Sequence, residues 1–231
     1  TVLEHKDFLI KPTNFNVPYD AERIHGISTE LAKEQGISLN EGLILFNNAL
    51  EKTTFIVGQN LNFDLNIMGC EFHRLGIESK LSSLPILDTC TEKTAFMCKI
   101  PGGRGGKFKL PTLTELHTHL FGTGFGEAHN ATADVEATTR CFLELIRLRE
   151  FTKEQLDVDE AYFKNFSEQN PTPIQVIGLK HINLKKESDT IRKRLEKLKN
   201  TATTKSTSDG LTALENVQFT HLHNHTQFSV L

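Results

Sequence analysis

The stretch that decides the fold is "TTFIVGQNLNFDLNIMGCEFHRLG", residues 53–76. Its first part is a short apolar run rich in β-branched residues, which is typical of a buried strand. Its second part places apolar side chains at helical spacing and ends in a glycine, which is typical of a helix and its C-terminal cap; the apolar positions are Phe63, Ile67, Cys70 and Leu75. A strand followed at once by a helix predicts one unit of an α/β domain.

The same alternation of strands and helices continues on both sides of this unit. We expect strands in residues 1–12 and 84–90, and helices in residues 38–52, 112–122 and 130–148. Strands that alternate with helices define an α/β domain. We place this domain at residues 1–150.

The rest of the chain has a different composition. Residues 151–217 contain a Pro-rich turn, a basic amphipathic segment at 180–200 and a Thr/Ser-rich stretch, and we interpret them as a linker with one basic helix. Residues 218–231 are strand-like, and we expect them to begin another domain. Because "TVLEHKDFLIKP" reads as a strand already under way, we also expect that the sequence is a truncated piece.

Composition narrows the class of protein. The chain has 231 residues, 38% hydrophobic and 24% charged, with a formal net charge of -3. A negative total charge argues against a protein that coats nucleic acid non-specifically. The four cysteines are widely spaced, which we interpret as reduced thiols of a cytoplasmic protein. Without a run of about 18 apolar residues, no membrane span is expected.

Asp64 is the first candidate site residue. It follows the strand of the opening stretch and lies at the start of the helix, beside Gln59 and Asn60. A carboxylate at a helix N-terminus is favoured by the helix dipole, which is a purely structural explanation. The carboxyl end of a strand is also where open α/β sheets build their sites. The residues alone leave both explanations open.

His129 and Asp134 form the second candidate, in "HNATADVEAT" at residues 129–138. Residues five apart on a continuous helix point in different directions, so both can face one cleft only if His129 precedes the helix. A histidine can accept a proton from water, and a carboxylate can bind a hard cation such as Mg²⁺. Two such ions would stabilise the attacking and leaving oxygens of a phosphodiester. Helix capping remains the structural alternative for the pair.

Three motifs together resemble a known family. "IHGIS" (24–28), "VGQNLNFDLNIM" (57–68) and "HNATADVEAT" (129–138) are similar to the DEDDh 3'–5' exonucleases of the ribonuclease H-like superfamily, which includes the proofreading epsilon subunit of bacterial DNA polymerase III. The resemblance covers residues 1–150 and implies a mixed sheet flanked by helices, with Mg²⁺ or Mn²⁺ in a two-metal site. It implies these roles: His129 as general base, Asp64 and Asp134 as metal ligands, and His25, Asn60 and Phe63 at the terminal nucleotide.

One motif of that family is missing from the printed sequence. The resemblance also implies an Asp-x-Glu pair on a first strand, and no such pair precedes Thr1. We therefore expect that the first strand lies upstream and that the protein as given binds metal poorly. That the protein as given is inactive stays an open alternative.

A second resemblance concerns residues 218–231. "FTHLHNHTQFSVL" is similar to the start of the PHP domain of bacterial polymerase alpha subunits, and this implies a separate metal held by His223 and His225. Alternate residues of a strand point to one face, so the two imidazoles can share a metal. The order of domains suggests a polymerase III alpha-type chain with a fused proofreading domain, with a DNA 3' end as substrate.

Two alternatives to DNA proofreading stay open: an exonuclease of the same family that acts on RNA, and a non-catalytic tethering or nucleic-acid-binding module. The basic segment 180–200 is interpreted as a solvated helix in preference to a docking helix. The loop "GGRGGKFK" (102–109) is equally compatible with a mobile surface loop and with phosphate contacts from Arg104, Lys107 and Lys109.

Overall fold

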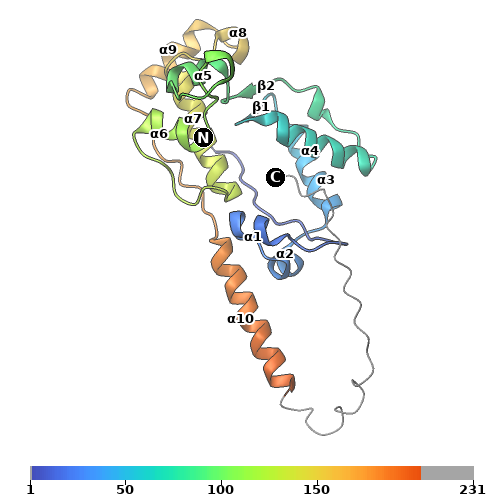
Figure 1. Ribbon diagram of the computed structural model, residues 1–231. Coiled ribbons are helices and arrows are strands. Elements are labelled where there is room, and N and C mark those ends of the chain that lie inside the picture. Colours follow the sequence, from blue (N-terminus) through green and yellow to red (C-terminus); the bar gives the residue numbers. More distant parts are fainter. Residues whose placement is uncertain (1, 204–231) are drawn as a thin grey trace. The chain divides into compact units, whose positions relative to one another are not determined.

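The structure is a computed structural model that describes the backbone of residues 2–203 and the side chains up to residue 200 (Figure 1). The elements follow one another in this order: α1 (Tyr19–His25), α2 (Thr29–Gln35), α3 (Leu39–Leu50), β1 (Ile56–Gly58), α4 (Leu61–Arg74), the 3-10 helix η1 (Lys80–Ser82), β2 (Ile86–Asp88), α5 (Glu92–Cys98), the 3-10 helix η2 (Arg104–Gly106), α6 (Leu113–Phe121), α7 (Ala131–Arg147), α8 (Lys153–Leu156), α9 (Glu160–Gln169) and α10 (Leu184–Thr203).

The sheet of the described chain consists of two parallel strands. β1 and β2 lie side by side, with Val57 opposite Leu87 and Gly58 opposite Asp88 (Figure 1). The pairing continues past the strands, because the backbone N–H of Thr89 donates to the carbonyl of Gly58 at 2.9 Å. β1, β2, α3, α4, α6 and α7 lie where the sequence predicted strands and helices, and the α/β class is confirmed, whereas α1, α2 and α5 were not predicted.

The prediction of a strand in residues 1–12 is wrong. Between residues 2 and 18 the described backbone forms only an isolated parallel bridge between Ile10 and Ile37. Two hydrogen bonds make this bridge, from Lys11 N–H to Ile37 carbonyl at 2.8 Å and from Ile37 N–H to Leu9 carbonyl at 2.9 Å. The next residue is Pro12, which has no N–H to continue the ladder.

Two apolar clusters hold the elements together. The larger one joins β2 to α6, α7, α8 and α9, and its buried members are Leu87, Leu116, Cys141, Leu145, Ile146, Phe151, Leu156 and Phe163. The smaller one joins α3, α4 and η1 through Leu43, Leu50, Phe72 and Leu81. Full burial of a Leu or Phe side chain contributes about 1.5–3 kcal/mol, so these clusters fix the helices on which the candidate residues stand.

Buried polar side chains lie between α6 and α7. His117 is 2% exposed, and its Nδ1 donates to the Thr123 carbonyl at 2.8 Å. Its Nε2 therefore accepts the hydrogen bond from Arg140 at 3.1 Å, since a guanidinium can only donate. Burial and the Arg140 charge lower the pKa of His117, although the hydrogen bond to Thr123 acts in the opposite direction. The fold thus keeps this imidazole neutral.

The chain continues to pack on this unit well past residue 150. The carboxylate of Glu144, 2% exposed, binds the Arg147 guanidinium and accepts a hydrogen bond from the Ile174 N–H at 2.9 Å. Further along, the two carboxylate oxygens of Glu136 accept from the N–H groups of Gly178 and Leu179 at 2.8 and 2.9 Å. Residues 174–179 are thereby held along α7. The compact unit that contains them extends from Thr1 to Asp189, and a second unit begins at Thr190.

α10, Leu184–Thr203, is the helix expected from the basic segment 180–200. Among its apolar residues, Ile191 is 3% exposed and Leu198 is 60% exposed. No helix within residues 2–203 is long and apolar enough to cross a lipid bilayer.

Candidate active site

The turn from β1 into α4 positions Asp64. Asn60 precedes the helix in the left-handed region, with φ 60°, and its own side chain makes no capping hydrogen bond. The carboxylate of Asp88 at the end of β2 caps the helix instead. It accepts hydrogen bonds from the backbone N–H groups of Asn60 at 2.9 Å, Leu61 at 2.8 Å and Cys90 at 2.7 Å. Asp64 therefore stands on a helix turn that the neighbouring strand secures.

The hydroxyl of Thr89 ties the same turn together from inside the fold. This side chain is fully buried and lies 3.0 Å from the Gly58 carbonyl and within hydrogen-bond distance of the Gln59 side-chain oxygen. The Gln59 amide donates in turn to the Pro111 carbonyl at 2.8 Å. These side chains at the carboxyl end of the two strands thus satisfy one another, whereas Asp64 is exposed.

Asp64 lies in an environment that disfavours its charge. Loss of hydration raises the pKa of Asp64, and the nearby Asp88 carboxylate raises it further, against a lowering effect of its own backbone amide. Within residues 2–200 no Lys or Arg forms an ion pair with Asp64. Its neighbours Asn60 and Phe63 are exposed, and the Phe63 ring is 64% accessible. A carboxylate without a cationic partner is a suitable ligand for a hard cation.

His129 precedes α7 and does not belong to it, as the sequence predicted. The helix begins at Ala131, and Asn130 caps it with a side-chain oxygen that accepts from the N–H groups of Thr132 and Ala133. His129 has φ 74°, in the left-handed region. This conformation turns its N–H toward the Asp134 carboxylate, which accepts it at 3.3 Å. The loop and the first helix turn are therefore linked, and the exposed imidazole stays accessible.

The Asp134 carboxyl is more deeply set than Asp64. Burial raises the pKa of Asp134, while the hydrogen bond from the His129 backbone and the charge of His129 partly offset this effect. The pair predicted from the sequence is thus close in space, with the carboxylate partly buried and the imidazole open to solvent.

His25 lies at the end of α1, next to a tight glycine turn. Its Nδ1 accepts the Ile27 N–H at 3.0 Å, and burial lowers the pKa of His25 against the opposing charge of Glu22. Gly26 has φ 78°, and a Cβ there would lie 2.8 Å from the backbone nitrogen of Lys185 in α10. Only glycine meets both demands. The side chain of the buried Ser188 secures the contact, because it accepts from Ser28 N–H at 3.0 Å and donates to the Gly26 carbonyl at 2.7 Å.

Residues 181–183 make a similar contact with the loop before α7. The Asn130 amide donates to the Ile182 carbonyl at 3.0 Å, and the Asn183 amide donates to Glu127 at 3.0 Å. His181 Nε2 lies 3.2 Å from the same Glu127 carboxylate. We call residues 174–188 the strap. The strap contacts both the loop that follows His25 and the loop that carries His129.

The structure joins some of the predicted residues and not others. His129 and Asp134 share a hydrogen bond, and Asn60 and Asp64 share the Asp88-capped turn. α7, which carries Asp134, packs on β1, which leads to Asp64. Within the described part of the chain, however, no hydrogen bond links the Asp88-capped turn to the His129–Asp134 pair. His223 and His225 lie outside the described residues.

The donor chemistry suits a divalent cation, but the ligand set is incomplete. Asp64 and Asp134 provide carboxylate oxygens of the type that Mg²⁺ and Mn²⁺ bind. Between residues 2 and 200, no three His, Cys, Asp or Glu side chains gather closely enough to hold a metal. Two carboxylates can anchor such an ion only together with further ligands.

Comparison with known proteins now gives the class of protein. A family model described as Exonuclease (RNase_T) matches residues 1–142, more than half of the chain. The chain belongs to this exonuclease family, in the DEDD superfamily with a ribonuclease H-like fold. Exonuclease domains of this family generally use divalent metal ions. A comparison with curated proteins finds no match.

Sequence reasoning missed Asp88 and Thr89. Both lie in "LPILDTC", which we had interpreted only as a strand. The available signal was an acid and a hydroxyl at the carboxyl end of a strand parallel to the one that precedes Asp64, since such ends meet at one edge of a sheet. Asp88 is a positioning residue here, because it acts on the turn that carries Asp64.

Proposed function

We propose that this chain is a 3'–5' exonuclease of the proofreading type, which removes nucleotides from DNA 3' ends. The observation that carries the proposal is the junction of His129 and Asp134, where a left-handed residue places an exposed imidazole beside a partly buried carboxylate. In an exonuclease family member, this arrangement suits proton transfer next to a metal-ligand position.

The described residues have distinct parts in the proposed reaction. A divalent cation held by Asp64 and Asp134 with further ligands would polarise the phosphodiester and lower the pKa of a water. His129 takes the proton of the attacking water, since it is accessible and its backbone is fixed by Asp134. Asn60 and Phe63 border the terminal nucleotide from the start of α4, and His25 borders it from the end of α1.

We also propose a replicative setting for the domain. Its support is the resemblance of residues 218–231 to the start of a PHP domain, with His223 and His225 as ligands of a separate metal. In that setting the partner of the exonuclease is a polymerase III alpha region, in the same chain or in another.

The test is hydrolysis of a 5'-labelled DNA primer with a mismatched 3' end, in Mg²⁺ and in Mn²⁺. It uses the printed chain and a version that carries an Asp-x-Glu strand ahead of Thr1. We expect nucleotides to leave one at a time from the 3' end in the extended version, and Asp134→Asn and His129→Ala to abolish this release. Lys164→Ala, an exposed charge deletion on α9, serves as the control.

Two outcomes would overturn parts of the proposal. Faster hydrolysis of an RNA strand of the same sequence would assign the domain to RNA. An extended version that binds the primer but releases no nucleotide would favour the non-catalytic binding module.

A further inference from the structure

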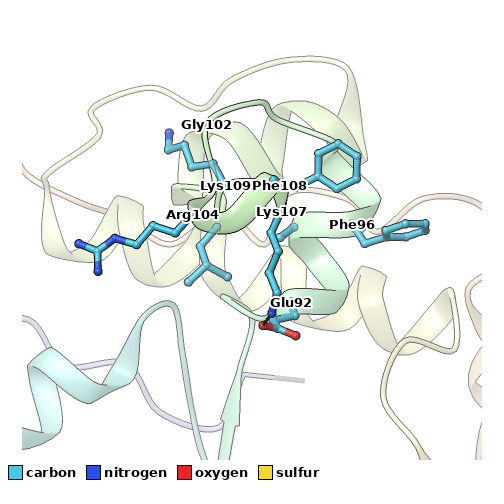
Figure 2. Close-up of a pocket in the computed structure, with 11 residues that line it drawn as sticks. Glu92, Phe96, Gly102, Arg104, Lys107, Phe108 and Lys109 are labelled. Atoms are coloured by element: carbon cyan, nitrogen blue, oxygen red, sulfur yellow. Dashed lines mark hydrogen bonds and ion pairs between the residues drawn. The ribbon is translucent and has the colours of Figure 1, made fainter.

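A cavity of about 650 Å³ lies between α5 and the loop that follows it (Figure 2). The loop closes on itself, because the N–H of Lys109 donates to the Ile100 carbonyl at 2.8 Å. Glycines at 102, 103 and 106 line much of the wall, so peptide groups there are not covered by side chains. The cavity is separate from Asp64, His129 and Asp134, none of which lines it.

Two aromatic rings are exposed at this cavity. Phe96 is 66% exposed and Phe108 is 39% exposed, although apolar rings of this size are usually buried. Their centroids lie 5.9 Å apart with an interplanar angle of 67°, an edge-to-face pair. Lys99 Nζ lies 5.8 Å from the centroid of the Phe96 ring. Figure 2 shows both rings on one side of the cavity.

The segment that carries the two rings is rich in basic residues. Residues 93–109 contain five basic residues and no acidic residue, in a chain with a net charge of -3. Lys107 pairs with Glu92 at 2.7 Å, and Lys109 pairs with Glu115 at 2.8 Å. Within residues 2–200, Arg104 forms no ion pair, and Figure 2 shows it extending away from the two rings. The cavity thus has an aromatic side and a cationic side.

We propose that this cavity is an auxiliary binding site for single-stranded nucleic acid, outside the candidate active site. One or two bases stack on Phe96 and Phe108, and the adjoining phosphates pair with Arg104 and Lys99. Exposed aromatic rings that receive bases, combined with cations that receive phosphates, are the usual features of sequence-independent single-strand binding. Arg104 supplies the cation on the far side of the cavity, and Lys99 lies beside Phe96, outside the cavity wall. An unpaired base presents a flat face to such rings, whereas the bases of a duplex are stacked on each other.

The auxiliary site would hold the strand while the 3' end is processed elsewhere on the domain. This inference goes beyond the proposed hydrolysis and does not depend on it, because strand binding here uses no metal. The sequence was equally compatible with a mobile surface loop and with phosphate contacts at residues 102–109. The proposal favours phosphate contact, made by Arg104. Lys107 and Lys109 keep their carboxylate partners and do not carry the proposal.

The test is the fluorescence anisotropy of a labelled oligothymidylate, titrated with the full chain in buffer that contains EDTA. Phe96→Ala and Phe108→Ala should each weaken binding by about 5- to 150-fold, the range that loss of one stacked base produces. Arg104→Ala should reduce the slope of log affinity against log salt by about 0.7, the value for one phosphate contact on a single strand.

Matched controls are Phe15→Ala, since Phe15 is 64% exposed, and Lys164→Ala. Both should bind the oligonucleotide like the unchanged chain. All five substituted side chains are exposed, and circular dichroism checks that each variant keeps its helices.

The proposal is overturned if Phe96→Ala and Phe108→Ala bind as tightly as the controls, which would leave the cavity to another ligand such as a protein segment. Equal loss in variants and controls would also overturn it, since binding would then be non-specific. Binding is measured without metal, so it does not depend on whether the chain hydrolyses DNA. A failure of the binding proposal and a failure of the hydrolysis proposal are therefore distinguishable.

Discussion

Replacing Asp88 by alanine should loosen the helix turn that carries Asp64. The Asp88 carboxylate accepts hydrogen bonds from the backbone N–H groups of Asn60, Leu61 and Cys90. In Asp88→Ala all three donors lose their acceptor. Since Asn60 caps α4 without a side-chain hydrogen bond of its own, nothing else within the described turn replaces this cap.

The size of the effect follows from the exposure of the three donors. The Asn60 amide is exposed and can bind water instead, whereas the amides of Leu61 and Cys90 are partly buried. A buried donor left without a partner costs about 1–3 kcal/mol, so two partly buried ones should lower the free energy of unfolding by about 2–3 kcal/mol. Asp88→Asn keeps one acceptor oxygen and should cost about 1 kcal/mol.

Urea denaturation of both variants measures these losses. A second readout is specific to the site: Asp88→Asn removes a negative charge near Asp64, so the pKa of the Asp64 carboxyl should fall, as followed by carbon NMR. The reasoning is refuted if Asp88→Ala unfolds at the same urea concentration as the unchanged chain, or if the pKa of Asp64 does not move in Asp88→Asn.

Three further predictions concern side chains described above. Asp134→Asn should raise the melting temperature of the metal-free chain at neutral pH. The pKa of the Asp134 carboxyl is raised in the folded state, so its stabilising contribution is lost as pH rises through that pKa, whereas an asparagine amide does not ionise and loses nothing. The pKa of His117 is lowered in the folded state, so its contribution to the free energy of unfolding is present above pH 6.5 and is lost as pH falls through the lower folded-state pKa. Thermal scans should therefore show the melting temperature falling as the pH drops below 6.5, and His117→Gln, which cannot be protonated beside Arg140, should reduce this dependence of melting temperature on pH. Ser188→Ala should reduce the free energy of unfolding by about 1–3 kcal/mol in urea, because it leaves a buried donor and acceptor unpaired, and a comparable loss in the exposed control Ser83→Ala would contradict this.

Features encoded by neighbouring residues were predicted correctly. The strand before Asp64, the helix after it and the late start of α7 follow from local apolar spacing, a capping asparagine and a left-handed residue. These depend on residues within a few positions of one another, and such patterns are visible in the chain itself.

Features that depend on distant partners were not predicted. Asp88 reaches Asn60 across 28 positions, and Ser188 reaches Ser28 across 160. The segment 1–12 has a strand-like pattern but needs a partner strand to form one, and in the described chain it finds only Ile37. An alternating pattern indicates that a segment is able to pair as a strand, but whether it pairs depends on a partner strand that the tertiary structure must supply.

The strap has a consequence for the order in which the protein is made. Domains generally fold from the N-terminus while synthesis proceeds. The loops beside His25 and His129 receive their partners Ser188, Ile182 and Asn183 only after the family-defined part of the chain, residues 1–142, has been completed. A nascent chain that has just finished α7 therefore has the loops beside His25 and His129 without these contacts. The site would therefore reach its full set of contacts late in translation, after the strap, residues 174–188, has emerged.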